Sequence, residues 1–138
     1  MNGALLRLIL SQVFLHTCMA GVRMAAPLWA LRQGFSEASV GVLLALFALT
    51  QVFFSIPAGR YTDRVGVRKP VSLGVVCASV GAGLAVAFPS FPVLCLSALM
   101  TGGATGLASI ALQRHVGRIA SNPVELRQLY SWFAIGPA

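Results

Sequence analysis

The stretch GRYTDRVGVRKP, residues Gly59 to Pro70, separates two long apolar runs and carries five of the chain's thirteen charged side chains. Charged residues make up only 9% of the 138-residue sequence, and hydrophobic residues make up 57%. A soluble domain usually carries about a quarter charged residues. So few charges cannot cover a water-exposed surface, and the composition therefore indicates an integral membrane protein.

Four apolar runs are each close to the roughly 20 residues that a helix needs to cross a bilayer. They span about 5–31, 38–58, 71–88 and 91–112, and the start of a fifth lies at about 128–138. The predicted fold is all-α: a polytopic transmembrane helix bundle with short links, occupying 1–138 as one domain in the lipid bilayer. The first run is long and lacks a clear small-x-small cleavage site, which favours a retained helix over a signal peptide.

The charges in the links predict how the helices cross the membrane. The link between the second and third runs holds four basic residues and one acid, and the link after the fourth holds three and one. The first link balances one base against one acid, and the third link has no charge. Because basic links stay cytoplasmic, we expect a multi-pass protein of the inner (plasma) membrane with its N-terminus in the cytoplasm. The net charge of +7 then reflects topology and not nucleic-acid binding.

Small residues four apart predict where helices approach closely in lipid. The candidate pairs are Gly41 and Ala45, Gly74 and Ala78, Ser79 and Gly83, and Gly102 and Gly106. We interpret all of them as packing seams, and none of them indicates a function by itself.

Polar side chains on the first apolar run form a stripe about 60° wide at 100° per residue, made up of Gln12, His16, Met19 and Arg23. A charged arginine facing lipid is heavily penalised, so the stripe should face protein or water. Snorkelling of Arg23 to the outer interface is the alternative. A lone histidine such as His16 is more often a buried hydrogen-bonded residue than a proton carrier.

The fourth run places hydroxyls at four-residue steps, at Ser97, Thr101, Thr105 and Ser109, and the second run adds Gln51 and Ser55. The third run has fewer polar residues. This contrast suggests that the first and fourth helices border a water-filled cavity and that the third is peripheral. The alternative is that these hydroxyls bond to carbonyl groups of their own helix. Pro27 predicts a local kink, whereas Pro57, Pro70 and Pro89 are expected at helix ends.

In the opening stretch, Gly59 and Gly66 predict a tight turn between antiparallel helices, and the basic residues predict contact with the anionic membrane surface. Asp63 is expected either to pair with a base or to lie at a helix N-terminus; an incidental aspartate in a basic loop is the other interpretation. The pattern G-x-x-x-D-R-x-G-x-R-K resembles the loop signature of the major facilitator superfamily. Its residues are Gly59, Asp63, Arg64, Gly66, Arg68 and Lys69.

Other segments share this resemblance, including GVRMAAPLWAL in the first run and SWFAIGPA at the start of the fifth. The resemblance implies a secondary transporter of twelve helices in two halves, with the first and fourth helices lining a central cavity. It further implies that Asp63 clamps the two halves on the cytoplasmic side, with Arg64 and Arg68 completing a charge relay. Val67 stands where the family often has a further base. Leu99 and Met100 stand where many proton-coupled drug exporters have an arginine.

The chain is therefore expected to be the amino-terminal part of such a transporter, lacking the remaining helices of the same protein, with a small organic solute as its substrate and export favoured over import. The alternative is a small four-helix membrane protein that oligomerises or regulates a partner. The spacing of His, Asp and Glu residues predicts no metal site, no cofactor and no enzymatic activity. The three cysteines have no CxxC spacing and are expected to be packing residues.

Overall fold

A computed structural model describes residues 3–119, 123–124, 127–128 and 130–131 of the chain. Residues 3–119 form four helices, α1 (Gly3–Arg32), α2 (Glu37–Val65), α3 (Arg68–Ala87) and α4 (Phe91–Ile119). Each is long and apolar enough to cross a membrane, so the all-α prediction is confirmed for the described residues. The expected start of a fifth helix, at 128–138, lies mostly outside them.

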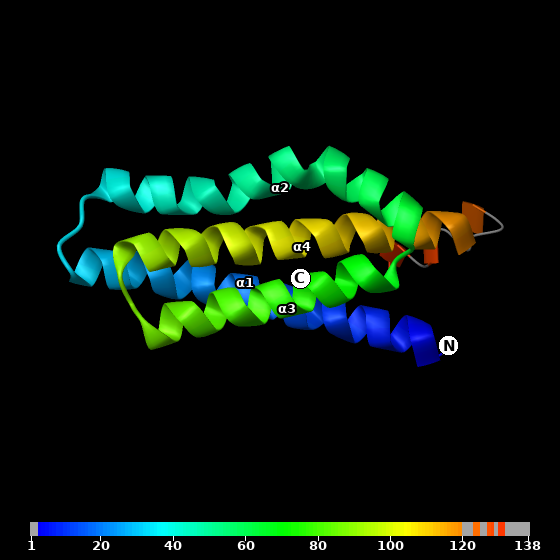
Figure 1. The fold of residues 1–138 in the computed structure, drawn as a ribbon, viewed down its shortest axis with the longest axis horizontal. Coiled ribbons are helices and arrows are strands. Elements are labelled where there is room, and N and C mark those ends of the chain that lie inside the picture. Colours follow the sequence, from blue (N-terminus) through cyan, green and yellow to red (C-terminus); the bar gives the residue numbers. More distant parts are fainter. Residues whose placement is uncertain (1–2, 120–122, 125–126, 129, 132–138) are drawn as a thin grey trace.

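Consecutive helices run antiparallel (Figure 1). The α1–α2 and α3–α4 links lie at one end of the bundle, and the start of α1, the α2–α3 link and the end of α4 lie at the other. Helix α4 packs extensively against both α2 and α3 and less extensively against α1. It is therefore the central element of this bundle, and α1 and α3 contact each other less than each of them contacts α4.

The charged stretch from Gly59 to Pro70 is mostly helical. Helix α2 continues through it to Val65, and only Gly66 and Val67 separate α2 from α3. Gly66 makes the turn with a φ of 79°, and its N–H donates to the carbonyl of Thr62. The expectation that Gly59 also forms the turn is wrong, because Gly59 is buried inside α2. Pro57 likewise lies within α2 and not at its end.

The seam between α2 and α4 depends on two glycines of α4. A Cβ on Gly102 would lie only 2.7 Å from the backbone oxygen of Phe47, and a Cβ on Gly106 would lie 3.3 Å from Cγ of Gln51. Such a close backbone approach is what small residues permit in a membrane bundle. The predicted Gly102–Gly106 seam is confirmed.

The other predicted seams have mixed outcomes. Gly74 and Ala78 of α3 are buried, and a Cβ on Gly74 would meet α4 backbone at 3.0 Å, so this seam is confirmed. Ser79 and Gly83 are exposed, and a Cβ on Gly83 or on Gly41 would meet nothing within 4 Å. These two predicted seams are wrong for the described part of the chain. The spacing of small residues marks a permissive stripe but does not say whether a helix lies against it.

Apolar side chains fill the bundle in two clusters. The cluster nearer the α2–α3 end includes Leu15 and Leu112, both fully buried, and small alanines of α4. The other lies toward the α1–α2 end and is centred on Ala26, Leu43 and Leu94. Between them these clusters fix how α1 lies against α4, and so where the polar side chains of α1 are presented.

Candidate functional site

Asp63 lies in the last turns of α2 and binds two arginines of α4. Its Oδ2 accepts from Nη1 of Arg114, and its Oδ1 accepts from Nη2 of Arg118 at 2.8 Å. Because Arg114 and Arg118 are one helical turn apart, they present both guanidinium groups on one face of α4. Asp63 is therefore paired, as one of the two sequence interpretations expected, but its partners come from another helix and not from its own link.

Helix α4 extends seven residues beyond the apolar run at 91–112, and this extension brings both arginines to α2. The sequence pattern places them in the link after the fourth apolar run and does not connect them with Asp63. The signal in the sequence is the i,i+4 spacing of Arg114 and Arg118. This spacing places two guanidinium groups on one helix face, where both can bind the same carboxylate. All three side chains are substantially exposed, with Asp63 at 40%. Exposed ion pairs contribute little to stability, so this cluster is poorly explained as a device that holds the fold together.

Gly59 lies beneath this cluster, one turn before Asp63 on α2. A Cβ at Gly59 would lie 2.7 Å from Nη2 of Arg114 and 3.0 Å from its Cζ. The absence of a side chain at Gly59 therefore lets the Arg114 guanidinium lie across the helix and reach Asp63. The motif glycine serves close approach here and not chain reversal.

The remaining motif residues lie at the same end of the bundle. Arg64 is exposed in the last turn of α2, and Arg68 and Lys69 are exposed in the first turn of α3. Among the described residues, the ion pairs of this region join Asp63 only to the two arginines of α4. The relay through Arg64 and Arg68 that the resemblance implied stays a prediction.

A first group of polar side chains joins α1 to α4 within the bundle. Gln12 is buried and its Nε2 donates to Oγ of Ser109 at 2.7 Å. Nδ1 of His16 lies 3.1 Å from Nε2 of Gln12 and 3.1 Å from the Gln12 backbone oxygen. Oε1 of Gln12 is buried with no partner among the described residues, although such an acceptor usually has one.

A second group joins α1, α2 and α4. Nε2 of Gln51 donates to Oγ1 of Thr105 at 3.4 Å and to Sδ of Met19 at 3.6 Å. Thr105 also approaches Sδ of Met19 at 3.1 Å. A three-helix junction thus forms where Met19, Gln51 and Thr105 meet.

The hydroxyls of α4 also bond within their own helix. Thr101 donates to the carbonyl of Ser97 at 2.7 Å, and Thr105 donates to that of Thr101 at 2.9 Å. All three side chains are buried, and Oγ of Ser97 has no partner in the part of the chain that the structure describes. Ser97 and Thr101 face neighbouring helices here, so a cavity-lining role for these hydroxyls stays a prediction.

Arg23 differs from the rest of the stripe on α1, because its side chain is exposed whereas Gln12 is buried and His16 and Met19 are half-buried. No ion pair of Arg23 occurs among the residues that the structure places. Its position in the last third of a spanning helix leaves its charge to be compensated by water or by a group outside the described residues.

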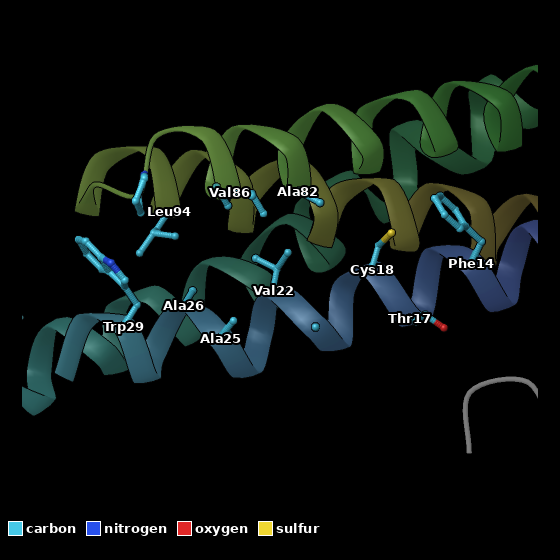
Figure 2. Close-up of a pocket in the computed structure, with 13 residues that line it drawn as sticks. Phe14, Thr17, Cys18, Val22, Ala25, Ala26, Trp29, Ala82, Val86 and Leu94 are labelled. Carbon is cyan, nitrogen blue, oxygen red and sulfur yellow. The ribbon is translucent and has the colours of Figure 1, made fainter. Parts of the chain in front are cut away.

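The other side of α1 borders an apolar groove of about 380 Å³. Figure 2 shows Phe14, Cys18, Val22 and Trp29 of α1 along it, opposite α3 and Leu94 of α4. Apart from Thr17, Cys18 and the indole N–H of Trp29 its lining is apolar, so this groove offers few groups that could orient a polar solute. The described residues also contain no cluster of three His, Cys, Asp or Glu side chains that could hold a metal.

A family profile described as the Major Facilitator Superfamily matches residues 8–136 of this chain. The match covers nearly the whole sequence, including most of α1, all of α2, α3 and α4, and the charged connection between α2 and α3. This chain belongs to the major facilitator superfamily, a family of membrane transporters.

Two curated proteins of Escherichia coli are similar to the chain. The inner membrane transport protein YajR of strain K12 is 39% identical over 83 residues, which cover 58% of this chain and 18% of that protein. The tetracycline resistance protein of class E is 36% identical over 100 residues, which cover 68% of this chain and 25% of that protein. The matches thus span a quarter or less of each relative's length. No solved structure matches the chain.

Proposed function

We propose that this chain forms the first four helices, and the start of the fifth, of a secondary transporter that moves a small organic solute by alternating access. Transporters of this family are built from two six-helix halves that rock against each other around a central binding site. The four helices described here correspond to the beginning of the first half. The short coverage of both relatives supports a longer protein with further helices.

In this proposal both polar groups lie beside the solute pathway: Gln12 and His16 in the first, and Gln51 and Thr105 in the second. The exposed Arg23 lies further along the same flank of α1. The N-terminus, the α2–α3 link and the end of α4 lie in the cytoplasm, because the basic residues gather at that end. The name of the class E relative refers to tetracycline resistance, and that of the other to transport. We infer export of an organic solute as the direction of transport.

The observation that carries the proposal is the Asp63 cluster. Two arginines of α4 take both carboxylate oxygens, so the acid is held in one orientation at the cytoplasmic end, where the second half would close. An exposed ion pair of little stabilising energy suits a contact that forms and breaks in each transport cycle. Asp63 and its arginines would bias the equilibrium between the two open states, and the solute would shift that equilibrium by binding one state better.

The test replaces Asp63 with Asn in the full-length protein and measures efflux from cells against a panel of organic solutes that includes tetracycline. We expect transport to fall about tenfold, which is within the range that a typical coupling energy produces. The abundance of the protein in the membrane should stay the same. Glu37→Gln is the matched control, because Glu37 is an exposed acid at the other end of α2. Equal transport by Asp63→Asn and wild type would refute the gate role.

A further inference from the structure

Arg23 is a cation in the last third of a spanning helix, inside the apolar run. It lies nine residues before the end of α1, at Arg32, which is about 14 Å along the helix axis. The other arginines of α1, Arg7 and Arg32, lie near its two ends, where the membrane surfaces are close. A charge at the depth of Arg23 is expensive unless it lies in a water-filled cavity or pairs with an opposite charge.

The four described helices offer Arg23 no acid. The chain's three acids are Glu37, Asp63 and Glu125. Asp63 is bound to α4 at the opposite end of the bundle, and Glu125 follows the end of α4 in the sequence. Glu37 begins α2 at the end where α1 finishes, beyond the level of Arg23. Any opposite charge that pairs with Arg23 therefore comes from outside the described helices.

Helix geometry gives the flank of α1 on which Arg23 lies. At about 100° per residue, Arg23 is about 20° from His16 and about 40° from Met19 around the helix. Met19 contacts Gln51 of α2 and Thr105 of α4. Cys18, in the apolar groove of Figure 2, is about 140° away. Arg23 thus belongs to the polar flank and is directed away from the groove.

The direction of the side chain disfavours snorkelling to the outer surface. The Cα–Cβ bonds of a helix tilt toward its N-terminus, which for α1 is the end that carries Arg7. The Cα–Cβ bond of Arg23 therefore points toward the level of Met19 and away from Arg32. A guanidinium that continues in this direction would approach the level of the three-helix junction, where Gln51 and Thr105 supply neutral polar groups.

We propose that Arg23 binds an anionic group, a carboxylate or its equivalent, of the transported solute. A guanidinium presents a planar fork of donors that suits a carboxylate. The spanning parts of this bundle place one cation and neutral amides, hydroxyls and an imidazole beside the pathway, so their electrostatic potential favours an anion over a cation. The inference rests on the proposed transport function and narrows its substrate class.

The test uses matched pairs of solutes in which a carboxylate is replaced by a primary amide, such as benzoate with benzamide and salicylate with salicylamide. Transport is measured in cells that carry the full-length protein as wild type, Arg23→Gln, Arg23→Lys or Arg32→Gln. We expect the wild type to transport at least one of the acids and not to transport the corresponding amide. Arg23→Gln should raise the KM for that acid at least about tenfold, as expected for loss of a charge-assisted contact.

The controls separate recognition from structure. Arg32→Gln removes an exposed arginine from the end of the same helix and should behave as wild type. Arg23→Lys should fall between wild type and Arg23→Gln, because a lysine keeps the charge but loses the bidentate geometry. If Arg23→Gln does not accumulate in the membrane, Arg23→Lys and acid-dependent thermal stabilisation of the purified wild type carry the test.

Three outcomes contradict the inference. Transport of the amides or of cationic solutes, with Arg23→Gln equal to wild type, refutes it and leaves the transporter assignment standing. Restoration of Arg23→Gln by neutralising an acid elsewhere in the full-length protein would assign Arg23 to an internal ion pair. If no solute of any charge is moved by the wild type, the transport function itself fails, and this inference fails with it.

Discussion

At the scale of single residues, the Arg114 guanidinium packs directly against Gly59. A Cβ at residue 59 would lie only 2.7 Å from Nη2 of Arg114. We predict that Gly59→Ala displaces Arg114 from Asp63 and reduces transport several-fold, with the fold retained. The obstructing atoms are the end of a flexible, exposed side chain that can move away, so no backbone has to shift. Transport per molecule in the membrane and the melting temperature of the purified protein together measure the effect.

Gly117→Ala is the control for this substitution, because Gly117 lies between the two arginines on α4 and a Cβ there meets nothing within 4 Å. It should leave transport unchanged and stabilise α4 slightly, since alanine is the better helix former. A large loss of melting temperature in Gly59→Ala with normal transport would mean that the glycine serves packing and not the Asp63 cluster.

The same residues mark the limit of sequence reasoning. The motif indicates that Asp63 is a functional residue, and Arg64 and Arg68 are bases close to it in the sequence. Its actual partners lie 51 and 55 residues away, and only the packing of α4 against α2 brings them close. The sequence does not distinguish a glycine that makes a turn from a glycine that leaves room for a neighbouring side chain. The prediction that Gly59 forms the turn is wrong for this reason.

At the scale of elements, the contact of α2 with α4 depends on Gly102. We predict that Gly102→Ala destabilises the bundle by about 1–3 kcal/mol, the usual range for overpacking. A Cβ there would press on the backbone oxygen of Phe47 and on Oγ1 of Thr50, within 2.7 and 2.8 Å. Because the first of these is backbone, relief requires the helices to separate. The free energy of unfolding in detergent, or the melting temperature, measures the loss.

Gly41→Ala on α2 is the matched control, since a Cβ at Gly41 meets nothing within 4 Å. It should be neutral or slightly stabilising. Equal stabilities for the two variants would contradict the seam. The comparison also explains why element packing was only partly predictable: Gly41 and Gly102 both stand in small-xxx-small patterns, and the pattern does not report which stripe faces a partner. The lengths of the apolar runs indicate the four helices. They do not indicate that α2 and α4 continue beyond these runs, because the last turns of both helices are polar.

At the scale of the whole molecule, large apolar side chains remain exposed on every helix, among them Met24, Val52, Phe53 and Val86. Such a surface suits lipid or further helices. The basic residues concentrate at the end that holds the Asp63 cluster, and the opposite end holds the nearly uncharged links. Charge asymmetry therefore predicts an orientation for the whole bundle, and the proposed gate is meaningful only if that end lies in the cytoplasm.

Labelling of single cysteines tests this orientation in a background in which the three native cysteines are replaced by alanine. We predict that Ser36→Cys and Ser90→Cys, in the α1–α2 and α3–α4 links, react with a membrane-impermeant maleimide on intact cells. Gly117→Cys, near the end of α4, should react only after the membrane is permeabilised. All three positions are exposed, so a difference reports the side of the membrane and not burial. The reverse pattern would place Asp63 outside the cell, where it could not form a cytoplasmic gate, although the α2–α4 contacts would stand.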